Sequence, residues 1–130
     1  MAQLFSLGIV RMVVIIMIIL HYIANLFAGL FLCNCVPHLA CGLSGEGFPT
    51  PFAKPPGVGF SSALTNFLWG FSNLVAGLVL LSLSDITVGF NLGCILFLGG
   101  VLLMGVFSSR RFEAVKAGKK DRNGSSHQKQ

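Results

Sequence analysis

Three apolar runs, each long enough to cross a lipid bilayer, constrain this sequence more than any other feature. They cover residues 7–32, 63–82 and about 86–107. A transmembrane helix needs about 20 mainly apolar residues, because each residue adds about 1.5 Å along a hydrocarbon core about 30 Å thick. Only 10% of the residues are charged, whereas soluble domains carry about 25%. The sequence therefore predicts an all-α integral membrane protein built as a bundle of three transmembrane helices.

The segment between the first and second runs, residues 33–62, differs in composition from the rest of the chain. It holds all five prolines and three of the four cysteines, and its only charged residues are Glu46 and Lys54. Proline and glycine at this density interrupt a continuous helix. A nearly neutral segment with phenylalanines along it is also a poor candidate for a loop that extends into water. We therefore predict a Pro/Gly-rich loop that lies at the membrane interface or folds against one end of the bundle.

The positive charge of the chain is concentrated in residues 108–130. This segment holds seven of the nine Lys and Arg residues and two of the four acidic residues, and so carries the whole net charge of +5. Basic residues directly after a transmembrane helix mark the cytoplasmic side. This placement predicts a cytoplasmic C-terminus, an N-terminus outside and a cytoplasmic loop 33–62. The position of these basic residues also accounts for the net positive charge of the chain, so the charge does not indicate a nucleic-acid partner. The domain organisation is then a transmembrane helical domain, residues 1–107, followed by a basic, disordered tail.

Small and polar residues recur at helical spacing inside the apolar runs. In hydrocarbon, such residues mark the faces on which helices pack. In the second run, Asn66, Gly70, Asn73 and Gly77 share one face. In the third run, the spacing places Gly89, Gly93 and Gly100 together.

Two interpretations of the intramembrane polar residues remain open. In the first, these residues only join the helices, each hydrogen bond contributing about 0.6 kcal/mol. In the second, four of them converge on a polar site at membrane depth. No carboxylate in the three runs is available to pair with a protonated histidine, which argues against a proton-coupled pump. The four residues of this candidate site are His21, Asn25, Asn66 and Asn73.

A cluster of soft-metal ligand types lies in residues 33–41. Thiol and imidazole groups bind zinc or copper(I), so the cluster is a candidate metal site. Its spacing is unlike that of a zinc finger, which pairs a Cys-x-x-Cys knuckle with a distant second pair. Two alternatives are simple packing of apolar thiols and a disulfide or redox pair, which would require the loop to lie outside. The candidate ligands are Cys33, Cys35, His38 and Cys41.

The sequence contains none of the common catalytic motifs. It lacks a Gly-x-Ser-x-Gly elbow, a phosphate-binding loop and a His-Glu-x-x-His helix. The leading hypothesis is thus a non-catalytic membrane protein, either a structural or accessory subunit or an oligomeric conduit for a small solute. Three helices enclose little space, so a conduit would need several copies. The expected partners are membrane lipid and either further copies of the chain or another membrane protein. The alternatives are a metal- or redox-handling membrane protein and a small membrane enzyme with the loop as its active site.

The predicted topology can be tested with a membrane-impermeant thiol reagent on intact cells. The cysteines of residues 33–41 should react only after the cells are disrupted, because a cytoplasmic loop is shielded by the membrane. Labelling of intact cells that requires prior reduction would contradict this topology and would indicate an external disulfide.

Overall fold

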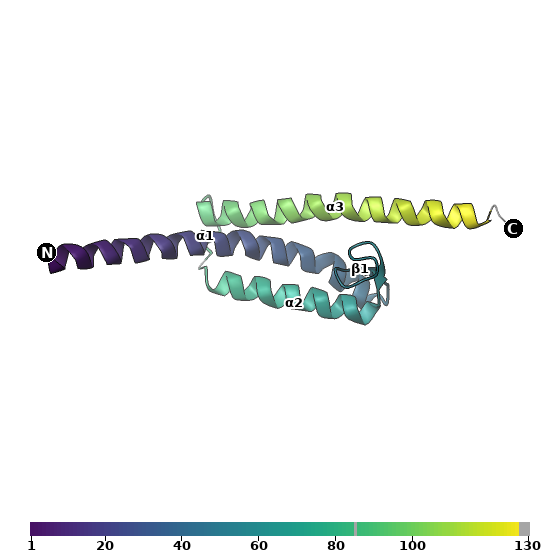
Figure 1. Cartoon of the computed structure of the whole chain (residues 1–130), viewed down its shortest axis with the longest axis horizontal. Helices are drawn as coiled ribbons and strands as arrows, with labels where there is room; N and C mark the ends of the chain where they lie inside the picture. The colour runs from purple at the N-terminus through teal and green to yellow at the C-terminus, as the bar shows by residue number, and fades with distance from the viewer. Residues whose placement is uncertain (85, 128–130) are drawn as a thin grey trace.

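The structure, a computed structural model, consists of three long helices and one two-stranded hairpin (Figure 1). It describes residues 1–84 and 86–127, without the side chains of residues 2, 116 and 119–127. Each helix contains a stretch long and apolar enough to cross a membrane, which confirms the predicted all-helical class with three helices of spanning length. The elements are α1 (Ala2–Leu43), β1 (Phe48–Pro49), β2 (Phe60–Ser61), α2 (Ala63–Ser82) and α3 (Leu92–His127).

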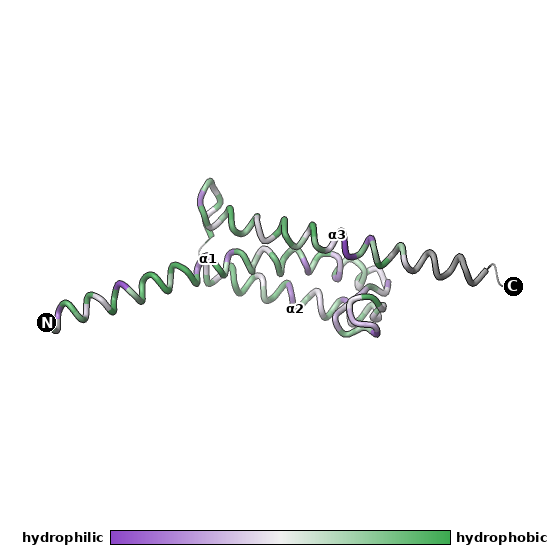
Figure 2. The backbone as a smooth tube through the Cα atoms, turned by 45° about the horizontal axis from the view of Figure 1, so that its top comes forward, coloured by the Kyte–Doolittle hydropathy of each residue, from purple (hydrophilic) through white to green (hydrophobic). Residues whose placement is uncertain are grey.

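Helix α1 lies between the other two helices. Its contacts with α2 and with α3 are the principal helix contacts in the described structure. Helix α2 runs back along α1, whereas α3 runs in the same direction as α1, so the two chain ends lie at opposite ends of the molecule (Figures 1 and 2). The arrangement is therefore a row of helices with α1 in the middle, and α1 positions everything else.

Two glycines allow α1 and α3 to approach each other closely. A Cβ atom added to Gly29 would lie 2.1 Å from the carbonyl oxygen of Phe97, and one added to Gly100 would lie 2.1 Å from that of Leu26. Both positions are buried. The contact is reciprocal, each glycine facing the backbone of the other helix. Such close approach maximises dispersion contacts, which drive helix association where lipid makes hydrophobic burial ineffective.

The interface between α1 and α2 is built in the same way. A Cβ atom on Gly70 would lie 2.8 Å from the backbone nitrogen of Leu39, and one on Gly77 would lie 2.6 Å from the side chain of Leu32. The face predicted from the spacing in the second run is confirmed as the packing face, since all four of its members are buried: Asn66, Gly70, Asn73 and Gly77.

The first helix ends at Leu43, not at residue 32 as predicted, and it contains Pro37. A proline inside a helix removes one hydrogen-bond donor and introduces a clash with the preceding turn. Here the segment after Pro37 packs on α2, where a Cβ atom added to Gly42 would lie 2.6 Å from the backbone nitrogen of Phe67, and this packing favours a helix that continues past the proline. Two residues after the helix end, Gly45 has a φ of 75°, the left-handed conformation that glycine adopts easily and that turns the chain away from the helix axis.

The third helix begins at Leu92, later than the predicted residue 86. Asn91 caps it, accepting a hydrogen bond of 2.9 Å from the backbone N–H of Cys94. Gly89 therefore lies outside the helix and is exposed, and only Gly93 and Gly100 of the predicted glycine face are buried. Asp85, whose side chain is of a type that caps helices and would precede a helix beginning at residue 86, lies outside the described residues.

At its other end, α3 continues to His127 and so includes much of the segment expected to be disordered. Strong helix formers such as Ala, Arg, Lys and Glu are frequent after residue 108. Two side chains in this part, Ser108 and Val115, are also buried. Propensity and packing together favour a helix at the start of this segment, and the disordered tail as a separate unit stays a prediction.

Replacement of Gly100 by leucine tests the contact between α1 and α3. We expect the free energy of unfolding in detergent to fall by about 1–3 kcal/mol, because the new side chain must push two backbones apart. Gly99→Leu is the matched control, since a Cβ at Gly99 meets nothing within 4 Å. Equal destabilisation by the two variants, measured by thermal unfolding, would contradict this packing.

Candidate functional site

The segment between α1 and α2 is a compact hairpin at one end of the helices (Figure 1). Strands β1 and β2 pair antiparallel, with Phe48 opposite Ser61. The carbonyl oxygen of Thr50 accepts hydrogen bonds from the backbone N–H of Ala53, at 3.2 Å, and of Gly57, at 2.9 Å. The hydroxyl groups of Thr50 and Ser61 are also bonded to each other. Backbone and side-chain hydrogen bonds thus hold this segment in one shape.

The buried side chains of His38 and Asn66 connect α1 to α2 beneath this hairpin. The distance between His38 Nδ1 and Asn66 Oδ1 is 2.9 Å, and the two residues are 2% and 0% exposed. Because Asn66 Nδ2 points at carbonyl oxygens, Oδ1 is the acceptor and His38 Nδ1–H the donor. Asn66 Nδ2 donates at 3.1 Å to the carbonyl oxygens of Phe48, Ser61 and Ser62. One amide therefore joins α1, the hairpin and the start of α2.

Three aromatic rings surround the His38 imidazole with their planes nearly perpendicular to it. The ring centroids of Phe48, Trp69 and Phe112 lie 5.4, 6.5 and 6.4 Å from that of His38. Phe48 and Phe112 also contact each other, with centroids 4.3 Å apart. These rings come from the hairpin, α2 and α3, so His38 marks the point at which all parts of the fold meet.

A cavity of about 360 Å³ opens beside His38. Its walls are mainly apolar and aromatic, and Trp69 and Phe112 are among them. Polar groups reach it from three elements. They are Asn34 on α1, Thr50 in the hairpin, and Ser108 and Arg111 on α3. A concave apolar site with a few convergent polar groups is the usual form of a small-ligand site.

The structure places the four predicted intramembrane polar residues in separate surroundings. Asn66 binds His38, and Asn73 accepts a hydrogen bond of 3.0 Å from Asn34 Nδ2. Asn25 is fully buried, and in the described part of the chain neither of its amide atoms has a hydrogen-bond partner. His21 lines a groove near the other end of α2. Among the described residues no hydrogen bond joins any two of these four.

The four candidate metal ligands lie on the last part of α1, not in a loop. Within the described residues, no group of three or more His, Cys, Asp or Glu side chains is placed to hold a metal ion. The Cys35 thiol donates to the carbonyl oxygen of Leu32 at 3.0 Å, and His38 is bonded to Asn66. Cys33 and Cys41, like the other cysteines, form no disulfide in the described chain. Zinc or copper binding by this cluster therefore stays a prediction.

Of the residues that line the cavity, sequence reasoning named only His38 as a site residue and missed the others, among them Asn34, Trp69 and Phe112. Asn34 and His38 are four residues apart, so on a helix they share a face. A loop beginning at residue 33, as the proline and glycine content predicts, would not have this periodicity, so the shared face becomes visible only when α1 continues to Leu43. Phe112 was missed because it follows the apolar run and belonged to the predicted tail.

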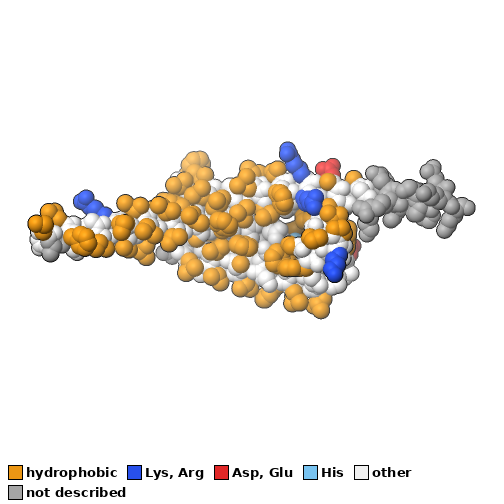
Figure 3. Space-filling view, in the orientation of Figure 1, with side chains coloured by type: hydrophobic (Ala, Val, Ile, Leu, Met, Phe, Trp, Pro, Cys, Tyr) orange, Lys and Arg blue, Asp and Glu red, His pale blue; other side chains and the backbone are white. Residues whose placement is uncertain are grey.

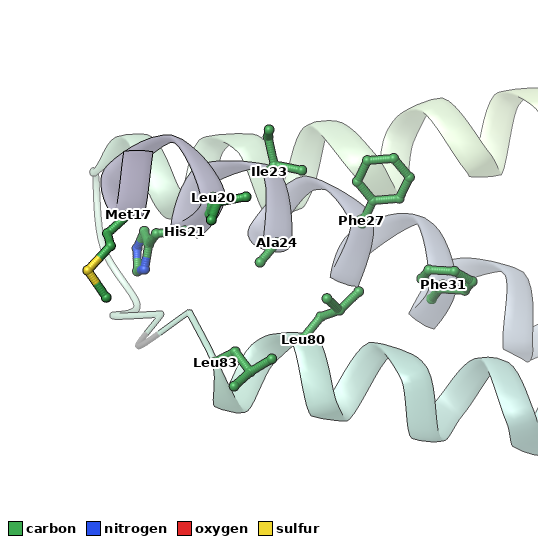
Figure 4. A pocket seen from close by; sticks show the side chains of 9 residues that line it. All are labelled: Met17, Leu20, His21, Ile23, Ala24, Phe27, Phe31, Leu80 and Leu83. Carbon is green, nitrogen blue, oxygen red and sulfur yellow. The ribbon is translucent and has the colours of Figure 1, made fainter. Parts of the chain in front are cut away.

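A second concave surface lies where α1 leaves the helix row. Residues 3–20 of α1, which we call the N-terminal arm, extend past the other helices and are exposed along their whole length (Figures 1 and 3). At the base of the arm, a groove of about 630 Å³ lies between α1 and α2. In Figure 4, Leu80 of α2 points toward α1 across this groove, and Leu83, which follows α2, also lines it. His21 is the one polar residue among apolar neighbours such as Met17 and Ala24.

Comparisons of the chain with protein-family models, with curated proteins and with solved structures found no match.

The substitution Asn66→Ala tests the central hydrogen bonds of the site. It leaves the His38 Nδ1–H and several carbonyl groups without this partner, and each buried polar group left unpaired costs about 1–3 kcal/mol. We expect a lower thermal unfolding temperature and faster amide hydrogen exchange in residues 47–61.

The matched control is Ser72→Ala on the same helix. The Ser72 hydroxyl is exposed and bonds to the carbonyl oxygen of Leu68 in its own helix, so its loss should change stability by less than about 0.5 kcal/mol. If Asn66→Ala behaves like this control, the amide does not hold the hairpin.

Proposed function

We propose that the protein is a multi-pass integral membrane protein that acts as a non-catalytic accessory subunit. Its N-terminal arm is the surface that binds another membrane protein. The observation that carries this proposal is the exposure of residues 3–20, an almost entirely apolar helix that nothing in the described chain covers. The orientation follows from the basic residues of α3: the C-terminus and the hairpin face the cytoplasm, and the arm lies at the outer end.

The length of α1 supports a protein partner for the arm. Its 42 residues form a helix about 63 Å long, at 1.5 Å per residue. The hydrocarbon core of a bilayer is about 30 Å thick. The part of α1 that packs beside α2 already occupies this depth. The hydrocarbon core of one bilayer is therefore too thin to surround both that part of α1 and the arm. We infer that an apolar surface of another protein shields the arm from water.

Charge favours a different protein over a second copy. Arg11 is the one charged residue of the arm, and the first acidic residue of the chain is Glu46. Two identical arms side by side would bring arginine near arginine with no carboxylate between them. A partner helix that carries an acidic residue would neutralise Arg11, which is costly to leave unpaired in an apolar interface. Such a helix could continue into the groove at the base of the arm, where His21 supplies a hydrogen-bonding group.

The proposal can be tested with a photo-crosslinking amino acid placed at Ile15 in the full chain, expressed in its native membrane. We expect one discrete adduct whose added mass is not a multiple of 13.9 kDa, the mass of this chain. The same probe at Leu78, exposed on α2, is the control and should give no such adduct. Arg11→Glu should abolish the adduct, whereas Arg11→Lys should retain it, because only the first change repels a carboxylate.

Two outcomes of this experiment would overturn the proposal. A ladder of multiples of 13.9 kDa would instead support the homo-oligomer, and with it the conduit. An adduct that forms equally from Leu78 would show that the arm makes no specific protein contact. Survival of the adduct in Arg11→Glu would contradict the acidic residue assigned to the partner.

A further inference from the structure

We infer that the cavity beside His38 binds the phosphate headgroup of an anionic membrane lipid. The site lies at the opposite end of the helices from the arm, so the inference does not depend on the partner proposed above. It requires only that the protein sits in a lipid environment.

The position of the cavity fits the headgroup layer of a bilayer. Its lining includes Phe107, the end of the third apolar run, and Ser108 and Arg111, the start of the basic segment. Lys and Arg side chains gather at this end of the molecule, whereas apolar side chains cover the surface along the helices (Figure 3). The cavity is thus placed where apolar chains and charged headgroups meet.

The charges around the cavity favour an anion. Arg111 is exposed on α3 and reaches over the hairpin, where its guanidinium lies 3.5 Å from the Cβ position of Gly57. No ion pair of Arg111 occurs within the described residues, and neither Glu46 nor Glu113 lines the cavity. An exposed cation at the mouth of a pocket without a carboxylate has no internal counter-charge. A phosphate supplies this charge and accepts paired hydrogen bonds from a guanidinium.

A second donor points to the same ligand. Ser108 lies three residues before Arg111, so the two side chains share one face of α3. Both line the cavity, and Ser108 is 9% exposed. Its hydroxyl and the guanidinium together offer hydrogen bonds to one phosphate group, while Trp69, Phe107 and Phe112 provide an apolar wall for the adjoining glycerol and acyl carbons. Basic pockets between transmembrane helices on the cytoplasmic side bind lipid headgroups in this way.

The test uses the full chain, purified in a neutral detergent, and measures lipid affinity by native mass spectrometry. We expect phosphatidylglycerol to bind at least about tenfold more tightly than phosphatidylcholine, because the choline cation of phosphatidylcholine offsets the phosphate charge that would pair with Arg111. Arg111→Gln should remove most of this preference, and Ser108→Ala should reduce it by a smaller factor. Arg110→Gln, at the neighbouring exposed position that does not line this cavity, is the matched control and should retain it.

Inorganic phosphate distinguishes a lipid from a free anion. If phosphate alone competes with phosphatidylglycerol at equal concentration, the site recognises a free anion and the inference of a lipid is wrong. Equal binding of the two lipids, or an equal loss in the Arg110 and Arg111 variants, would show a nonspecific basic surface and would also overturn it. Thermal unfolding of each variant confirms that the fold is retained, as expected for an exposed arginine.

Discussion

The close backbone contacts at glycines on α1 and its neighbours determine the rest of this structure. Gly29 and Gly100 bring α1 and α3 together, and Gly70 and Gly77 bring α2 against α1. Helices that cross a bilayer gain no driving force by hiding leucine from lipid, so they associate where their backbones can approach. Because only α1 takes part in both interfaces, it becomes the middle helix and the other two need not touch each other extensively.

The glycine contacts also determine which polar side chains meet. Gly70 lies one turn from Asn66 and almost one turn from Asn73. Its close contact with Leu39 fixes the position of α2 along the axis of α1. In that position the side chain of Asn66 forms a hydrogen bond with His38, and that of Asn73 forms one with Asn34. Asn25 is different, because it is buried against Gly93 on the α3 side without a hydrogen-bond partner in the described chain. The polar residues thus secure the α1–α2 pair more than the α1–α3 pair.

The sequence predicted what depends on local pattern and failed where tertiary packing decides. The face of α2 followed directly from the spacing of Asn66, Gly70, Asn73 and Gly77. The end of α1 did not, because Pro37 is a helix breaker by local rules, whereas the helix continues past it and packs on α2. The cavity could not be predicted for the same reason. Its parts come from α1, the hairpin, α2 and α3, and its position depends on α1 continuing past residue 32.

Helix α1 is one continuous helix whose N-terminal arm extends beyond the other helices. The most direct test is a pulsed electron–electron distance measurement between spin labels at Ser6 and Leu43, both exposed. Labels attached through non-natural amino acids leave the four cysteines unchanged. A continuous helix predicts a single distance of about 56 Å, from 1.5 Å per residue. A distance below about 45 Å would show that the helix bends sharply or breaks, and the arm would then not be a straight extension of α1.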